Sequence, residues 1–164
     1  MFDIEEVARI ARTPFNEAKP VLLRGALPDP EGFFGEGHID DFMDRPRLVQ
    51  RAGVFRDQNL VGNTADYTRA FLEKKRREKG TLVTLRGLQR VPGPVRNACV
   101  GLMEAGGWPS VHALSLESDV DIVSLLPHWD MYPVVAVQTR GHKRWRVQRP
   151  LFDNESDVIT EWYK

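Results

Sequence analysis

Two residues with metal-binding side chains, His128 and Asp130, stand two positions apart within LLPHWDMYPVVAVQTRGHKRWRV, residues 125–147. On a β-strand this spacing places both side chains on the same face. An imidazole nitrogen and a carboxylate oxygen are two of the three ligands in the facial triad that holds non-haem Fe(II). A His-x-Asp pair also arises by chance in surface turns, so the pair alone leaves both interpretations open.

A lysine follows the pair at a distance that suits a strand, a turn and a returning strand. Lys143 lies thirteen residues after Asp130. An ammonium group in that place can pair with the far carboxylate of a dicarboxylate whose other end chelates the metal. The alternative is that Lys143, Arg144 and Arg146 form the solvated face of an ordinary hairpin.

The remaining candidates for chemistry have structural explanations, which we favour. His112 lies in an alternating segment and is either a substitute ligand or a structural residue. His142 is expected at an exposed turn, and His38 is expected to cap the helix that follows it. Cys99, the single cysteine, falls on the apolar face of a predicted helix, so we expect it in the core. One cysteine also excludes an intrachain disulfide and a thiolate zinc cluster.

Helices are expected first along the chain and antiparallel strands after them, which is the order of an α+β domain. The capping, periodicity and turn signals predict first a helix at residues 3–12 capped by Asp3, a buried strand Val21–Arg24, a loop at 27–37, a short helix Ile39–Met43 and a strand Leu48–Phe55. Next, we expect a helix from Asn63 or Thr64 to Lys79, a strand and turn in 81–91, and a helix opening at Pro92 and Pro94 with Val95, Ala98, Cys99, Leu102 and Met103 inward. Last, we expect strands within 110–118, within 121–126 and on both sides of Gly141.

The composition fits one domain with a real core, at 164 residues. Lys+Arg and Asp+Glu balance at 23 each, so no overall charge points to nucleic acid or an anionic membrane. The one basic cluster, residues 73–79, is interpreted as a solvated helix end rather than a contact with RNA or an acidic partner. We expect no signal peptide, no membrane span and a cytoplasmic setting.

One combination of motifs resembles a known family. TLVTLRGLQRV, then a helix, then PHWDMYPVVAVQTRGHKRWRVQRP is similar to the jumonji C family, in the ribosomal-oxygenase-like branch of the cupin superfamily. The most specific piece is His-x-Asp, an apolar strand, and Gln-x-x-Gly-x-Lys-x-Trp. KPVLLRGAL is similar to the usual entry to such domains, so the resemblance covers roughly residues 18–150.

The resemblance implies an Fe(II)- and 2-oxoglutarate-dependent oxygenase that hydroxylates a side chain of a protein or peptide. His128 and Asp130 would be the iron ligands, and Lys143 would bind 2-oxoglutarate. The implied fold is α+β, with N-terminal helices packed on a cupin-type double-stranded β-helix (jelly roll). Residues 1–109 would flank the barrel, and residues 110–164 would form its first part.

The sequence departs from the family pattern in two respects: it has LESDVDIVSLLPH where the family usually has a Gly-rich loop before the His, and it differs more strongly at the second iron ligand. The family has a second iron-binding His some tens of residues after the first, whereas no His follows His142 here. We therefore expect an incomplete barrel, finished by further chain, a second chain or a homo-oligomer, because a half-barrel leaves unpaired edges. The alternative is a catalytically inactive binding or scaffold module. Demethylation and a metal-dependent isomerase are less favoured.

Overall fold

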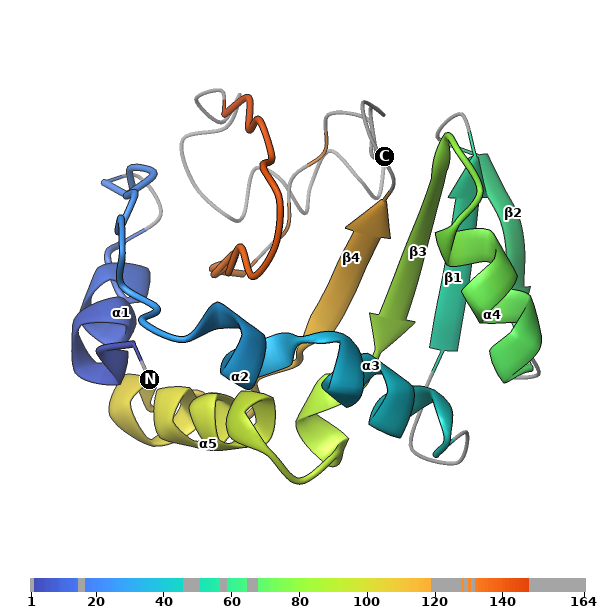
Figure 1. Cartoon of the computed structure of the whole chain (residues 1–164). Coiled ribbons are helices and arrows are strands. Elements are labelled where there is room, and N and C mark those ends of the chain that lie inside the picture. Colours follow the sequence, from blue (N-terminus) through green and yellow to red (C-terminus); the bar gives the residue numbers. More distant parts are fainter. Residues whose placement is uncertain are drawn as a thin grey trace.

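The computed structural model describes residues 2–14, 17–45, 51–56, 59–64, 68–118, 128, 130 and 132–147. Helices lie against an antiparallel sheet (Figure 1), so the predicted α+β class is confirmed. In chain order the elements are α1 Ile4–Ala11, α2 Pro30–Phe34, α3 Glu36–Met43, β1 Arg51–Arg56, β2 Asn59–Thr64, α4 Arg69–Arg76, β3 Thr81–Arg86, the 3₁₀ turn η1 Leu88–Arg90, α5 Pro94–Gly106 and β4 Leu114–Ser118.

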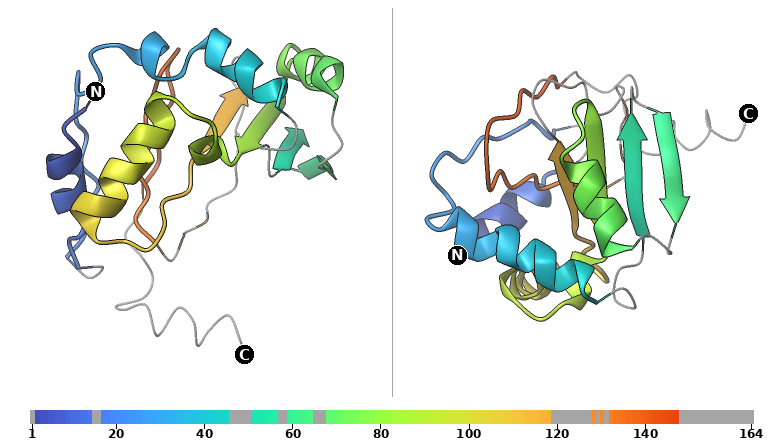
Figure 2. Two further views of the ribbon diagram at one scale, coloured as in Figure 1. Left: turned by 90° about the horizontal axis from the view of Figure 1, so that it is seen from below. Right: turned by 45° about the vertical axis from the view of Figure 1, so that its right-hand side comes forward.

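The four strands form one sheet in the order β2-β1-β3-β4, with every neighbouring pair antiparallel. β4 pairs with β3 so that Val83 lies opposite Glu117 and Leu85 opposite Ser115. Within the described residues this sheet is open, as two further views show (Figure 2), and β4 forms one of its edges. The closed jelly roll therefore stays a prediction.

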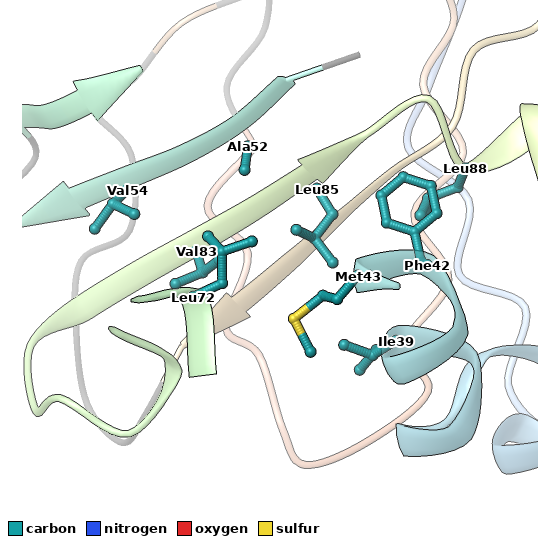
Figure 3. Packing of buried hydrophobic residues seen from close by; sticks show 9 residues of the cluster. All are labelled: Ile39, Phe42, Met43, Ala52, Val54, Leu72, Val83, Leu85 and Leu88. Carbon is teal, nitrogen blue, oxygen red and sulfur yellow. The ribbon is translucent and has the colours of Figure 1, made fainter. Parts of the chain in front are cut away.

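One face of the sheet packs against α3 and α4 to form the larger core. The side chains of β1 and β3 that share this face alternate along each strand, as a half-covered sheet requires. They meet apolar residues on the inner sides of the two helices (Figure 3). The buried members of this core are Ile39, Phe42, Met43, Ala52, Val54, Leu72, Val83, Leu85 and Leu88.

A second core lies where α1 and α2 pack on α5. Its buried members are Phe2, Val7, Ala8, Phe33, Ala98 and Leu102. Gly101 permits the close approach of α1, since a Cβ at this position would lie 2.7 Å from Cδ1 of Ile4. Ala98 and Leu102 belong to the predicted inner face of the helix after Pro94, so that prediction is confirmed.

Local capping signals set several helix ends as expected. The Asp3 carboxylate accepts a hydrogen bond from the Glu6 amide at 3.0 Å. Pro94 stands in the first turn of α5, and Gly107 ends that helix in the left-handed region. These interactions satisfy backbone groups that a helix end leaves without partners.

The predicted strand Val21–Arg24 is wrong. Residues 21–23 carry no regular structure, and Val21 and Leu22 are exposed. The three apolar residues Val21, Leu22 and Leu23 have no periodicity of their own, and no described strand pairs with them. The predicted loop at 27–37 is also wrong in part, because Asp29 caps the short helix α2 through the Gly32 amide at 2.9 Å.

The helix expected from Asn63 or Thr64 begins later. Residues 59–64 form β2, which pairs with β1, and the cap of α4 is Thr68, whose hydroxyl accepts from the Phe71 amide at 3.2 Å. Sheet pairing thus overrides the local capping signal at Thr64. The strand expected at 121–126 lies outside the described residues.

The two strands expected on either side of Gly141 are not present in the described structure. Residues 133–139 and 142–147 carry no strand, although the turn between them lies where predicted, with Gly141 at φ +65°. Alternation predicts only which side chains would share a face. A strand also needs a paired neighbour, and the ladder of the described sheet ends at β4.

Candidate functional site

The predicted metal ligands, His128 and Asp130, are both exposed. An imidazole and a carboxylate have the donor chemistry that Fe(II) takes. Across the described ranges, no three His, Cys, Asp or Glu side chains gather closely enough to hold a metal ion. The donor types therefore fit the ion, while the described residues leave the triad short of its third ligand.

The predicted 2-oxoglutarate residue, Lys143, rests on an aromatic ring. Its Nζ lies 5.1 Å from the ring centroid of Trp145, a cation–π contact. Neighbouring atoms partly desolvate the ammonium group and lower the pKa of Lys143, although the residue as a whole is exposed. The contact gives the lysine a defined direction without covering it.

The turn that precedes Lys143 is closed by a short hydrogen bond. The Gln138 side-chain amide donates to the carbonyl oxygen of Arg140 at 2.5 Å. Gly141 then takes the left-handed conformation that L side chains rarely adopt. Gln138 and Gly141 both belong to the motif identified from the sequence, and here they shape the turn.

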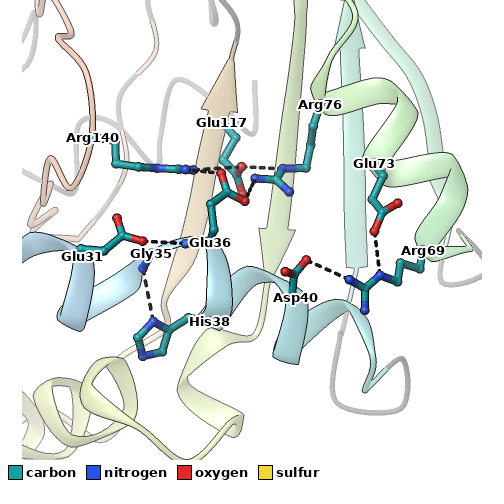
Figure 4. A network of polar contacts seen from close by, with 10 residues as sticks. All are labelled: Glu31, Gly35, Glu36, His38, Asp40, Arg69, Glu73, Arg76, Glu117 and Arg140. Atoms are coloured by element: carbon teal, nitrogen blue, oxygen red, sulfur yellow. Dashed lines mark hydrogen bonds and ion pairs between the residues drawn. The ribbon is translucent and has the colours of Figure 1, made fainter.

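A cluster of four charged side chains joins this turn to the helices and the sheet (Figure 4). Arg76, at the end of α4, donates from Nε to Oε2 of Glu117 at 2.7 Å and from Nη2 to Oε2 of Glu36 at 2.8 Å. Arg140 contacts the same two carboxylates: it donates to Oε1 of Glu36, and its Nη2 lies 3.7 Å from Oε2 of Glu117. We call these four residues the ion-pair cluster.

Burial and charge act in opposite directions within the ion-pair cluster. Burial raises the pKa of Glu117, and the positive charges of Arg76 and Arg140 oppose that rise. Hydrogen bonds from Arg140 and Arg76 lower the pKa of Glu36. Burial by itself would lower the pKa of Arg76, but its two carboxylate partners raise it. The cluster is therefore a partly buried network of charge-assisted hydrogen bonds.

A second arginine joins α4 to α3 away from the turn. Arg69 pairs with Asp40 at 3.0 Å, Asp44 at 2.5 Å and Glu73 at 2.7 Å. These partners lie on α3, just after it and on α4 itself. Arg69 thus resembles Arg76 in linking the two helices, but its ion pairs do not include the segment with Lys143.

The other histidines and the cysteine have the structural surroundings that we favoured. Nδ1 of His38 accepts from the Gly35 amide at 3.2 Å, which confirms the capping role. His112 lies 3.2 Å from the Gln89 side-chain amide, and His142 is exposed as predicted. Cys99 is buried in α5, and burial raises the pKa of its thiol.

Comparison with known proteins supports the resemblance for the C-terminal part of the chain. Residues 111–161 match the JmjC domain family. The match includes β4, His128, Asp130 and Lys143. No curated protein and no solved structure matches the chain. No helix in the described ranges is long and apolar enough to cross a membrane.

The ion-pair cluster was not predicted from the sequence. Its members lie in four separate segments, and Glu36 and Arg140 are 104 residues apart. No spacing rule connects such positions. Arg76 was interpreted as part of a solvated helix end, yet its side chain is only 14% exposed.

Proposed function

We propose that this chain is an Fe(II)- and 2-oxoglutarate-dependent oxygenase that hydroxylates a side chain of a protein or peptide. One observation carries the proposal: the JmjC domain match contains the His-x-Asp pair and the Gly-x-Lys-x-Trp turn together. The ribosomal-oxygenase-like branch and a cytoplasmic setting are part of the same proposal, on the strength of the sequence resemblance.

In this proposal each of the three residues has a separate role. His128 and Asp130 hold the iron through an imidazole nitrogen and a carboxylate oxygen. Lys143 binds the far carboxylate of 2-oxoglutarate, and the Trp145 ring directs its ammonium group. When bound, the iron couples the oxidation of 2-oxoglutarate by O₂ to hydroxylation of a substrate C–H bond. The protein orients the reactants and keeps water away.

We further propose that residues 110–164 form the first part of a cupin barrel and that residues 1–109 flank it. Further strands, a second chain or a second copy of this chain would supply the remaining part of the barrel and the third iron ligand. Large exposed apolar side chains on and near the site support this part. In a finished protein such side chains usually mark a surface that other protein covers. They are Leu114, Leu116, Tyr132, Val134, Val135, Val137, Trp145 and Val147.

The test is anaerobic titration of the chain with Fe(II) and then 2-oxoglutarate, followed by the absorption of the iron–ketoacid complex. We expect a band that His128→Ala and Asp130→Ala remove and that Lys143→Ala weakens. His142→Ala is the matched control, because His142 is an exposed histidine in the same region without a proposed role. A well-folded chain without the band shows that this chain, alone or as copies of itself, does not form the iron site.

The alternative function is a JmjC-like module that binds a partner without catalysis. The exposure of His128 and Asp130, and the lack of a third ligand among the described residues, favour this reading. The two functions differ in their response to mutation. A binding module keeps its partner when His128 is replaced by alanine and forms no succinate from 2-oxoglutarate, whereas the oxygenase forms succinate only with His128 in place.

A further inference from the structure

Among the described residues, the ion pairs that join the exposed segment carrying Lys143 to the core are those of one arginine. We propose that Arg140 is a positioning residue for Lys143: its ion pairs with Glu36 and Glu117 hold the turn before Lys143 against α3 and β4, and so set where the ammonium group meets 2-oxoglutarate. The part that concerns 2-oxoglutarate rests on the proposed function. The contact between the turn and the core does not.

The two carboxylates that bind Arg140, those of Glu36 and Glu117, are also held in place by Arg76. Arg76 holds Oε2 of Glu36 at 2.8 Å and Oε2 of Glu117 at 2.7 Å. Arg76 stands in the last turn of α4, and Glu117 stands in β4, which pairs with the central strand β3. Arg140 therefore docks on two carboxylates that Arg76 also binds, of which Glu117 is 14% exposed and Glu36 is 54% exposed.

Backbone pairing does not hold the segment in the described structure. Residues 133–139 and 142–147 carry no strand, and nearly all of their side chains are exposed. Among the ion pairs of the described residues, those that join this segment to a helix or to the sheet are the two of Arg140. Exposed ion pairs contribute little, but a partly buried acceptor such as Glu117 is screened less by salt.

The turn fixes the position of Lys143 relative to that of Arg140. The two lie three positions apart in sequence, which limits their Cα atoms to about 11 Å apart. The Gln138 hydrogen bond to the Arg140 carbonyl and the left-handed Gly141 fix the backbone between them. Lys143 then rests on Trp145. Release of Arg140 would remove the ion pairs that link this unit to α3 and β4.

Backbone ¹⁵N relaxation of the whole chain tests the contact without iron, because it reports the motion of an exposed segment that carries no strand. We expect Arg140→Gln to lower the order parameters of residues 138–147 to values below about 0.6, typical of flexible backbone, and to leave those of α5 unchanged. Arg140→Lys keeps the charge and should restore part of the order. Arg146→Gln is the control for charge, since it removes a cation from the same segment. Arg69→Gln is the control for links between α4 and α3. Unchanged order parameters in Arg140→Gln, or an equal fall in Arg146→Gln, overturn the proposal.

Titration of the iron-loaded chain with 2-oxoglutarate then tests the effect on Lys143. Arg140→Gln should raise the half-saturating concentration about tenfold, the size of effect typical of residues that orient a ligand-binding group. Arg140→Lys should recover most of the affinity, and Arg69→Gln should not change it. Lower order parameters with unchanged affinity overturn the positioning role. If the unaltered chain shows no iron–ketoacid band, this chain does not form the iron site by itself, and the relaxation result alone decides whether Arg140 holds the turn.

Discussion

Arg76 and Glu117, 41 residues apart in the chain, form an ion pair of 2.7 Å in which each side chain is only 14% exposed. The pair connects the end of α4 to the edge strand β4. Oε1 of Glu117 is buried without a hydrogen-bond partner in the described structure, so the carboxylate depends on what reaches Oε2. Arg140 also approaches Oε2, but at 3.7 Å.

Removal of Arg76 should destabilise the fold, because it leaves the Glu117 carboxylate partly buried with one distant partner. We expect Arg76→Leu to lower the free energy of unfolding by about 2 kcal/mol. Urea unfolding followed by circular dichroism measures this. Arg56→Gln is the control, since Arg56 pairs with Glu78 at the surface and its loss should change little. Equal losses in the two variants would rule out a special role for the buried pair.

The dependence of stability on pH should change when Glu117 is replaced. Burial raises the folded-state pKa of Glu117 above its unfolded value, so the folded chain keeps a proton that the unfolded chain has lost. Its contribution to stability is thus present below the ordinary glutamate pKa and is lost as pH rises through the raised pKa. The lowered pKa of Glu36 acts in the opposite sense, with stability lost as pH falls through it.

Glu117→Gln should therefore gain stability relative to the unaltered chain as pH rises from below the ordinary glutamate pKa toward neutrality. The measurement is the difference in free energy of unfolding between the two proteins over that range. A difference that does not vary with pH would show that Glu117 titrates normally in the folded chain.

Two glycines should respond in opposite ways to alanine. Gly107 ends α5 at φ +69°, where a Cβ is strained, so Gly107→Ala should destabilise the fold by about 1 kcal/mol. Gly37 lies inside α3 with open space around its Cα, so Gly37→Ala should stabilise by about 0.5–1 kcal/mol. Thermal unfolding of both variants measures this. A loss in both would contradict the helical conformation of Gly37.

The ring beneath Lys143 should matter for 2-oxoglutarate if the proposed function holds. Trp145→Leu removes the cation–π contact, so the ammonium group loses its direction and the half-saturating concentration of 2-oxoglutarate should rise about threefold. Trp145→Phe keeps a smaller ring and should show a smaller rise. The iron–ketoacid absorption measures both. A larger effect for phenylalanine than for leucine would exclude the ring as the cause.

Cys99 should be a poor nucleophile in the folded chain. Burial raises the pKa of its thiol, so little thiolate is present at mildly alkaline pH, and access is limited. We expect slow alkylation by iodoacetamide that becomes fast in urea. The double variant Cys99→Ala and Val100→Cys is the control, since Val100 is exposed on the same helix. Fast labelling of native Cys99 would place it outside the core.

The parts of the fold that the sequence predicts are those with strong local signals. Asp3 before an amphipathic turn marks α1, and Pro94 with Gly107 marks the two ends of α5. β3 follows from a short stretch of β-branched residues and leucines, TLVTL, which is buried along five residues. Each of these signals acts within a few residues, so its effect depends little on contacts with distant segments of the chain.

The parts that could not be predicted depend on distant partners. Residues 21–24 have β-propensity, but no described strand lies beside them. β2 takes the place of the start of a predicted helix, because β2 pairs with β1. For the site, residue types and spacing indicate His128, Asp130 and Lys143, whereas the third ligand and the support from Arg140 depend on tertiary arrangement. Alternation in one sequence carries no information on either.

The wide sequence separation within the ion-pair cluster has a consequence for the order of folding. β1 ends at Arg56 and β2 begins at Asn59, so this strand pair closes a small loop, and β3 pairs with β1 across the segment that contains β2 and α4. The contact between Glu36 and Arg140 closes a longer loop, of 104 residues, so we expect it to form after the sheet and helices that present Glu36. On the ribosome Glu36 emerges long before Arg140, whereas Glu117 precedes Arg140 closely in the sequence. Loss of Arg140 should consequently speed unfolding while leaving the refolding rate almost unchanged.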